Sequence, residues 1–92
     1  MARRTEPIRE LVVEVLQSIG RPYSEDITDK VCCAIENNSH WQARYQALTN
    51  DLRDWVVNNW IGVYCRELTG RKRGQQVRAS SSLIKSYSKL VV

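Results

Sequence analysis

Apolar residues recur at helical spacing in residues 8–19, and this repeat constrains the fold more than any other feature of the sequence. Steps of three and four residues place its members on one stripe of an α-helix. They are Ile8, Leu11, Val12, Val15, Leu16 and Ile19. Thr5 is a favoured N-cap residue, Pro7 is tolerated in a first turn, and Gly20 is typical of the residue after a helix. The sequence therefore predicts an amphipathic helix that ends at Gly20.

Two shorter helices are predicted between residues 24 and 50. The first has Ser24 as its N-cap residue and acidic residues in its first turn, where the helix dipole favours negative charge. We expect Asn37-Asn38 to end it, because asparagine tolerates the left-handed conformation. Its apolar side consists of Ile27, Val31, Ala34 and Ile35. The second begins at Ser39, which is spaced from Gln42 as in a capping box.

A fourth helix, at about residues 51–68, is apolar around most of its circumference. Such a helix lies among other helices or in an interface, so we expect it at the centre of a bundle. Its expected core residues are Trp55, Val56, Trp60, Ile61, Tyr64 and Leu68. Thr49-Asn50-Asp51 predicts a break before this helix. Because the apolar spacing nearly continues through that break, one long helix over residues 39–68 is the alternative.

The end of the chain changes in composition. Residues 71–82 are polar, basic and rich in small side chains, which predicts a flexible loop. Apolar residues then return at helical spacing and predict a short C-terminal helix over residues 83–92; they are Leu83, Ile84, Tyr87 and Leu90. A strand hairpin there is a less supported alternative. The predicted fold is all-α: one domain, residues 1–92, forming a compact bundle of four to five helices.

Charge is segregated along the chain. Residues 5–65 hold five Lys/Arg and nine Asp/Glu, a balance of −4, whereas residues 66–92 hold seven Lys/Arg and one acid, a balance of +6. A basic N-terminal arm, residues 1–4, adds Arg3 and Arg4, which gives the overall net charge of +4. A cationic end on an acidic body favours a polyanion as partner, most simply nucleic acid.

The residues expected to contact phosphates lie in the basic C-terminal region. They are Arg66, Arg71, Lys72, Arg73 and Arg78. Each neutralised phosphate releases counterions, so five contacts predict a slope of about −4 to −5 for log affinity against log salt concentration, using ~0.9 per phosphate. The alternatives are an acidic protein or a membrane surface as partner, and a solvated tail without a specific role. A membrane is the weaker of these partners, because residues 71–78 lack an apolar face to insert.

A polar strip on the fourth helix supplies candidate base contacts. Asp54, Asn58, Gly62 and Arg66 follow one another at steps of four, with Asn59 beside them. Asparagine pairs with adenine and arginine with guanine in the major groove, so Asn58 and Asn59 are the candidate base readers. The alternative is an exposed strip on an otherwise buried helix. Among the aromatic residues, Tyr23 and Tyr87 lie in short segments and are expected to be the most exposed.

No pattern in the sequence indicates catalysis, a cofactor or a metal. Cys32 and Cys33 are adjacent and point about 100° apart on a helix, and neither they, Cys65 nor His40 has the spacing of a zinc site. Three cysteines do not suggest a secreted disulfide framework. No apolar run is long enough for a membrane span, and charges at Glu6, Arg9 and Glu10 are incompatible with a signal peptide. We therefore expect a cytoplasmic, non-enzymatic protein.

These observations lead to two hypotheses about function. The first is a non-catalytic nucleic-acid-binding or regulatory module, expected as a homodimer, whose basic C-terminal region contacts phosphates. The second is a helical protein–protein interaction module without a nucleic-acid role. The second predicts a contiguous exposed apolar patch and an assembly that survives high salt, whereas the first predicts cations gathered on one face.

Overall fold

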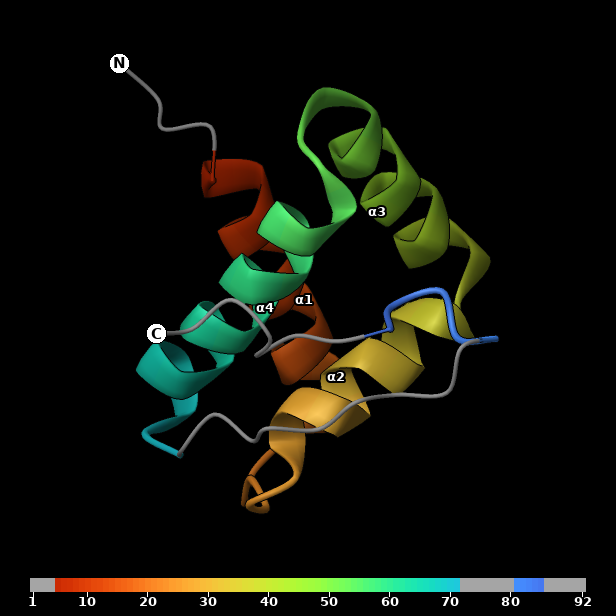
Figure 1. The fold of residues 1–92 in the computed structure, drawn as a ribbon. Coiled ribbons are helices and arrows are strands. Elements are labelled where there is room, and N and C mark those ends of the chain that lie inside the picture. Colours follow the sequence, from red (N-terminus) through yellow and green to blue (C-terminus); the bar gives the residue numbers. More distant parts are fainter. Residues whose placement is uncertain (1–4, 72–80, 86–92) are drawn as a thin grey trace.

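A computed structural model describes residues 5–71 and 81–85, and this part of the chain contains four helices and no strand (Figure 1). The helices are α1 (Glu6–Ile19), α2 (Ile27–Glu36), α3 (Ser39–Asp51) and α4 (Asp54–Thr69). Each helix contacts the other three, and the Cα radius of gyration is 11.9 Å. No helix in the described ranges has the length and apolar character needed to cross a membrane. The prediction of an all-α chain is confirmed for these residues.

Helix α1 follows its sequence pattern closely. Five of the six predicted stripe residues are buried, and only Ile19, the last residue of the helix, is exposed. Gly20 ends the helix with a φ of +82°, a conformation that side chains disfavour, and donates its N–H to the Leu16 carbonyl at 3.0 Å. Thr5 precedes the helix but its hydroxyl does not cap it; instead it accepts a hydrogen bond from the Tyr64 hydroxyl at 2.9 Å.

α2 ends at the predicted residues, but for a different reason. Asn37 and Asn38 have φ values of −99° and −121°, so neither adopts the left-handed conformation. Asn37 instead donates its side-chain amide to the Cys33 carbonyl at 2.8 Å. The Asn38 side-chain oxygen accepts the Trp41 N–H at 3.0 Å, which makes Asn38, and not Ser39, the N-cap residue of α3. These side-chain bonds satisfy helix-end groups without a positive φ.

Two predicted helix starts are displaced along the chain. α2 begins at Ile27, and the Ser24 hydroxyl donates to the Asp26 carboxylate in the turn before the helix. α4 begins at Asp54 after an extended Leu52, with φ −119° and ψ 154°. This extended residue separates α3 from α4, so the alternative of one long helix over residues 39–68 is wrong.

The core is formed mainly by α1, α2 and α4. Of the ten residues on the predicted apolar sides of the first two helices, Ile19 is exposed, Ala34 is partly buried and the other eight are buried: Ile8, Leu11, Val12, Val15, Leu16, Ile27, Val31 and Ile35. Of the residues expected from α4, Ile61 and Tyr64 are buried, whereas Val56, Trp60 and Leu68 are only partly buried. Trp55 is 48% exposed, so its prediction as a core residue is wrong. Because every helix touches the other three, the contacts do not single out α4 as the centre.

A short C-terminal segment returns to the bundle. Residues 81–85 are not helical, so a helix does not begin at residue 83 as predicted. Ile84 is nonetheless fully buried, and its N–H donates to the Glu36 carboxylate of α2 at 2.9 Å. The rest of the predicted C-terminal helix, most of the predicted basic loop and the N-terminal arm lie outside the described residues.

Candidate nucleic-acid interface

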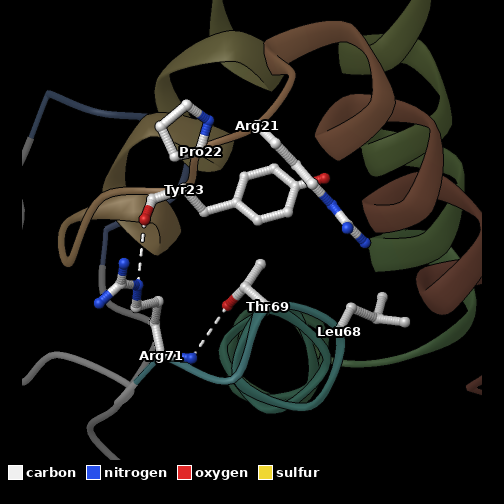
Figure 2. A pocket seen from close by; sticks show the side chains of 6 residues that line it. All are labelled: Arg21, Pro22, Tyr23, Leu68, Thr69 and Arg71. Atoms are coloured by element: carbon white, nitrogen blue, oxygen red, sulfur yellow. Dashed lines mark hydrogen bonds between the residues drawn. The ribbon is translucent and has the colours of Figure 1, made fainter.

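An open cleft of about 300 Å³ lies where the connector between α1 and α2 meets the end of α4 (Figure 2). Six residues line it: Arg21, Pro22, Tyr23, Leu68, Thr69 and Arg71. Two of these six carry a positive charge and none carries a negative charge. The cleft therefore combines cations with apolar surface from two segments that are far apart in the sequence.

The end of α1 positions one side of the cleft. The positive φ of Gly20 turns the chain away from the helix axis, and the Arg21–Pro22 peptide bond that follows is cis. Tyr23 then packs against the core while its hydroxyl reaches the Leu16 carbonyl at 3.5 Å. This arrangement holds the Tyr23 ring at the edge of the bundle, half-buried, with Arg21 exposed beside it.

The end of α4 positions the other side. Gly70 adopts the left-handed conformation, with φ +72°, and donates its N–H to the Arg66 carbonyl at 2.9 Å. The Thr69 hydroxyl donates to the Cys65 carbonyl at 2.5 Å and accepts the backbone N–H of Arg71 at 3.2 Å. These bonds direct the chain across the end of the helix, so that the Arg71 side chain extends toward the connector (Figure 2).

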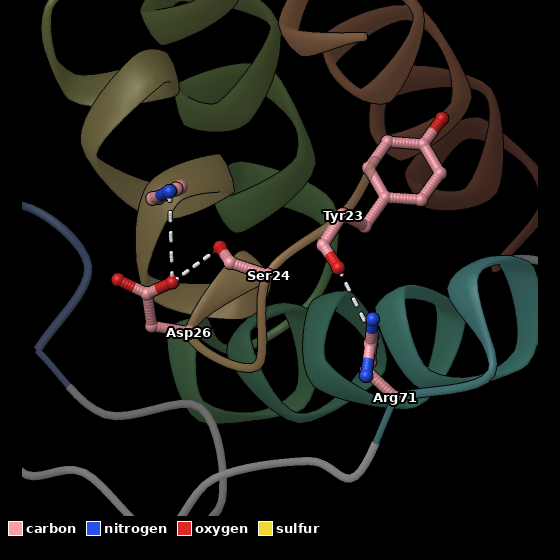
Figure 3. A network of polar contacts seen from close by, with 5 residues as sticks. Tyr23, Ser24, Asp26 and Arg71 are labelled. Carbon is pink, nitrogen blue, oxygen red and sulfur yellow. Dashed lines mark hydrogen bonds and ion pairs between the residues drawn. The ribbon is translucent and has the colours of Figure 1, made fainter. Parts of the chain in front are cut away.

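Arg71 links the two sides. Its Nε–H donates to the Tyr23 backbone carbonyl at 3.0 Å, across 48 positions of sequence (Figures 2 and 3). A guanidinium has five N–H donors, and this bond uses one of them while fixing the direction of the planar group. Figure 2 shows Arg21 and Arg71 on opposite sides of the Tyr23 ring. The cleft thus has two cationic lining residues, one of them already held in place.

The helix ends at the cleft offset part of the positive charge of its two arginines. α1 and α4 both end here, and each helix C-terminus carries about half a negative elementary charge. Two guanidinium groups outweigh that sum. Asp26 lies next to Ser24 in the polar network of Figure 3, and the Ser24 hydroxyl lowers the pKa of its carboxyl, helped by Lys30 at 3.7 Å. The Asp26 charge thus has its own cationic partner.

The predicted phosphate contacts are only partly within the described residues. Arg71 lines the cleft, and Arg66 is exposed on the last turn of α4 without lining it. Lys72, Arg73 and Arg78 lie outside the described residues. The structure thus places Arg71 in the lining of the same cleft as Arg21, which the sequence did not single out.

The candidate base readers are not on an exposed strip. Asn58 is only 5% exposed, and its side-chain oxygen accepts a hydrogen bond from the buried Tyr45 hydroxyl. A side chain held inside the core cannot reach a base edge, so the prediction of Asn58 as a base reader does not fit its position. Gly62 is buried as well, and Asn59 is partly buried. The strip is therefore exposed only at its ends, at Asp54 and Arg66.

Among the residues that the structure describes, no side-chain cluster suits a metal ion. No group of three or more His, Cys, Asp or Glu side chains in residues 5–71 and 81–85 is arranged to hold a metal. None of the three cysteines forms a disulfide. Burial raises the pKa of the Cys65 thiol to about 12, partly offset by a hydrogen bond with Thr28, so this thiol is protonated and unreactive at neutral pH.

Comparison with the models of known protein families gives no match to this chain, and neither a curated protein nor a solved structure matches it.

Proposed function

We propose that the chain is a non-catalytic nucleic-acid-binding module that contacts phosphates through the Arg21–Arg71 cleft and the basic segment after it. One observation carries the proposal. Two arginines from separate segments line one cleft that has no acidic lining residue, and Lys72 and Arg73 follow Arg71 in the sequence. The segregated charge of the sequence supports the same partner, because a polyanion can engage the cleft and the adjoining cations together.

The chemistry of arginine suits this role. Its planar guanidinium binds phosphate oxygens through two parallel N–H donors, which lysine cannot do. Because Arg71 is already held by the Tyr23 carbonyl, less conformational entropy is lost when it binds a phosphate. Arg21 is exposed and provides a second positive charge at the same cleft.

The protein-interaction hypothesis receives less support from the described surface. Ile19 and Trp55 are the large apolar side chains there that are more than a third exposed, and they lie on different helices. A stable protein interface needs a larger apolar core than two separate side chains provide.

The test is a binding titration with labelled DNA at several salt concentrations. The double variant Arg21→Gln/Arg71→Gln removes two charges from the cleft, and Arg9→Gln/Arg53→Gln removes two exposed charges elsewhere. We expect the cleft variant to reduce the salt slope by about 2 and the control variant to leave it nearly unchanged, using ~0.9 per phosphate on duplex DNA. Equal salt slopes for the two variants would rule out the cleft as the phosphate site. Light scattering at high salt, together with this titration, tests the rival hypothesis, which expects an oligomer that survives high salt and no binding to DNA.

A further inference from the structure

The cleft contains more than a phosphate site requires. Pro22, Tyr23 and Leu68 give it an apolar side with one aromatic ring, and Thr69 adds a hydroxyl. Inorganic phosphate or a duplex backbone would need only the two arginines. A flat ring beside cations suits a ligand that joins a planar apolar group to a phosphate, as a nucleotide does.

The position of Tyr23 favours stacking. Its ring is half-buried and packs against the core, and its hydroxyl reaches the Leu16 carbonyl. Its backbone carbonyl holds Arg71, so the ring and one cation are fixed relative to each other. A ring held in this way loses little conformational freedom when a base stacks on it.

The size of the cleft limits what can enter. Its volume of about 300 Å³ is at the lower end of the range for small-ligand sites, about 300–1,000 Å³. A single base can enter such a space, but a base pair stacked within a helix cannot present its face there. Building on the proposed function, we infer that the cleft binds one unpaired nucleotide, with the base against Tyr23 and phosphates at Arg21 and Arg71. The chain should therefore prefer single-stranded to duplex nucleic acid.

The experiment compares a short labelled polythymidine strand with the same strand annealed to its complement, at one near-physiological salt concentration. Tyr23→Leu removes the ring, Tyr23→Phe keeps it, and Trp55→Leu removes an exposed ring that does not line the cleft. We expect Tyr23→Leu to weaken single-strand binding by about 5-fold to about 150-fold, the range for loss of one stacked base. Tyr23→Phe and Trp55→Leu should bind as the parent does, and duplex affinity should change little. Thermal unfolding of each variant confirms that it is folded.

The outcomes separate this inference from the proposed function. If the parent binds both nucleic acids equally and Tyr23→Leu has no effect, the unpaired-nucleotide site is wrong. The phosphate-binding proposal still stands in that case, provided that Arg21→Gln/Arg71→Gln weakens binding more than the Arg9→Gln/Arg53→Gln control. If the two arginine double variants behave alike, the proposed function fails as well. Repeating the titration with polyuridine shows whether the cleft distinguishes RNA from DNA through the 2′-hydroxyl.

Discussion

Tyr45 and Tyr23 are the same residue type in two opposite environments. Tyr45 of α3 is 2% exposed, and its hydroxyl donates to Asn58 of α4, which is itself buried. Tyr23 lies at the edge of the bundle, half-buried, and lines the open cleft. The interior pair joins two helices through a hydrogen bond that water does not reach. The cleft joins two segments through a bond from Arg71 to a backbone carbonyl at the surface.

This difference indicates which part of the molecule maintains the fold and which part is available for a ligand. A buried polar group is costly unless it has a partner, so Tyr45 and Asn58 depend on each other. The Tyr23 ring has apolar contacts on its core side and borders a space that a ligand can enter. We therefore expect substitutions at the interior pair to change stability, and substitutions at the cleft to change binding.

The largest expected effect comes from removing the interior ring. Tyr45→Ala should lower the free energy of unfolding by about 3–5 kcal/mol, the usual cost of truncating a fully buried aromatic side chain. Tyr23→Ala should cost clearly less, because its ring is only half-buried. Denaturant titrations of both variants measure the difference. Equal losses would show that Tyr23 belongs to the core as fully as Tyr45 does.

Removing only the hydroxyl gives a smaller effect at the interior pair. Tyr45→Phe leaves the Asn58 amide buried without this partner, which should cost about 1–3 kcal/mol. The double variant Tyr45→Phe/Asn58→Leu should cost less than the sum of its two single variants, because it removes both polar groups. Tyr23→Phe is the matched control and should be nearly neutral, since its hydroxyl contact is long, at 3.5 Å. If the free-energy costs of the two single variants add up to that of the double variant, the Tyr45–Asn58 hydrogen bond contributes no coupling free energy.

The fold could be predicted from the sequence where apolar residues form one clear stripe along a helix. The stripe of α1 identified five buried residues because the rest of the helix surface is mostly charged or polar. α4 is apolar around most of its circumference, so periodicity could not show which arc faces the core, and Trp55 was wrongly placed inside. The burial of Ile84 likewise depends on where the chain returns after α4, which local spacing does not encode.

The candidate site was only partly predictable for a similar reason. The segregated charge identified Arg71, because a basic run is visible in the sequence. Arg21 stands alone in an acidic region, and only the fold brings it to the end of α4. Asn58 has the spacing of an exposed strip, but its burial follows from a partner on another helix, Tyr45. The sequence can suggest the charge of a site, whereas tertiary contacts determine which residues form it.

Alkaline pH should test the interior directly. Burial raises the pKa of the Cys65 thiol from its ordinary value of 9.0 to about 12, and it also raises the pKa of Tyr45. Between pH 9 and 12 the unfolded chain loses the thiol proton while the folded chain retains it. The free energy of unfolding should therefore fall as pH rises, by about 1.4 kcal/mol per pH unit for this thiol.

Urea titrations from pH 8 to about pH 11 measure this slope. Cys65→Ala should make it shallower, whatever its effect on stability at neutral pH. Tyr45→Phe should do the same at the higher pH values, because the hydroxyl that resists ionisation is gone. A slope unchanged in both variants would show that other groups control the alkaline transition.

The smallest expected effect on stability is at the cleft. Arg71→Gln should alter the free energy of unfolding by no more than about 0.5 kcal/mol, because Arg71 is exposed. The same substitution should weaken nucleic-acid binding and make its salt dependence shallower, since it removes one phosphate contact. Measuring both properties on one protein separates the two roles. If Arg71→Gln lowers the free energy of unfolding as much as Tyr45→Phe does, the bond between Arg71 and Tyr23 is one of the contacts that maintain the fold. Weaker binding would then follow from a destabilised bundle. A stable variant with weak binding would instead assign Arg71 to the ligand.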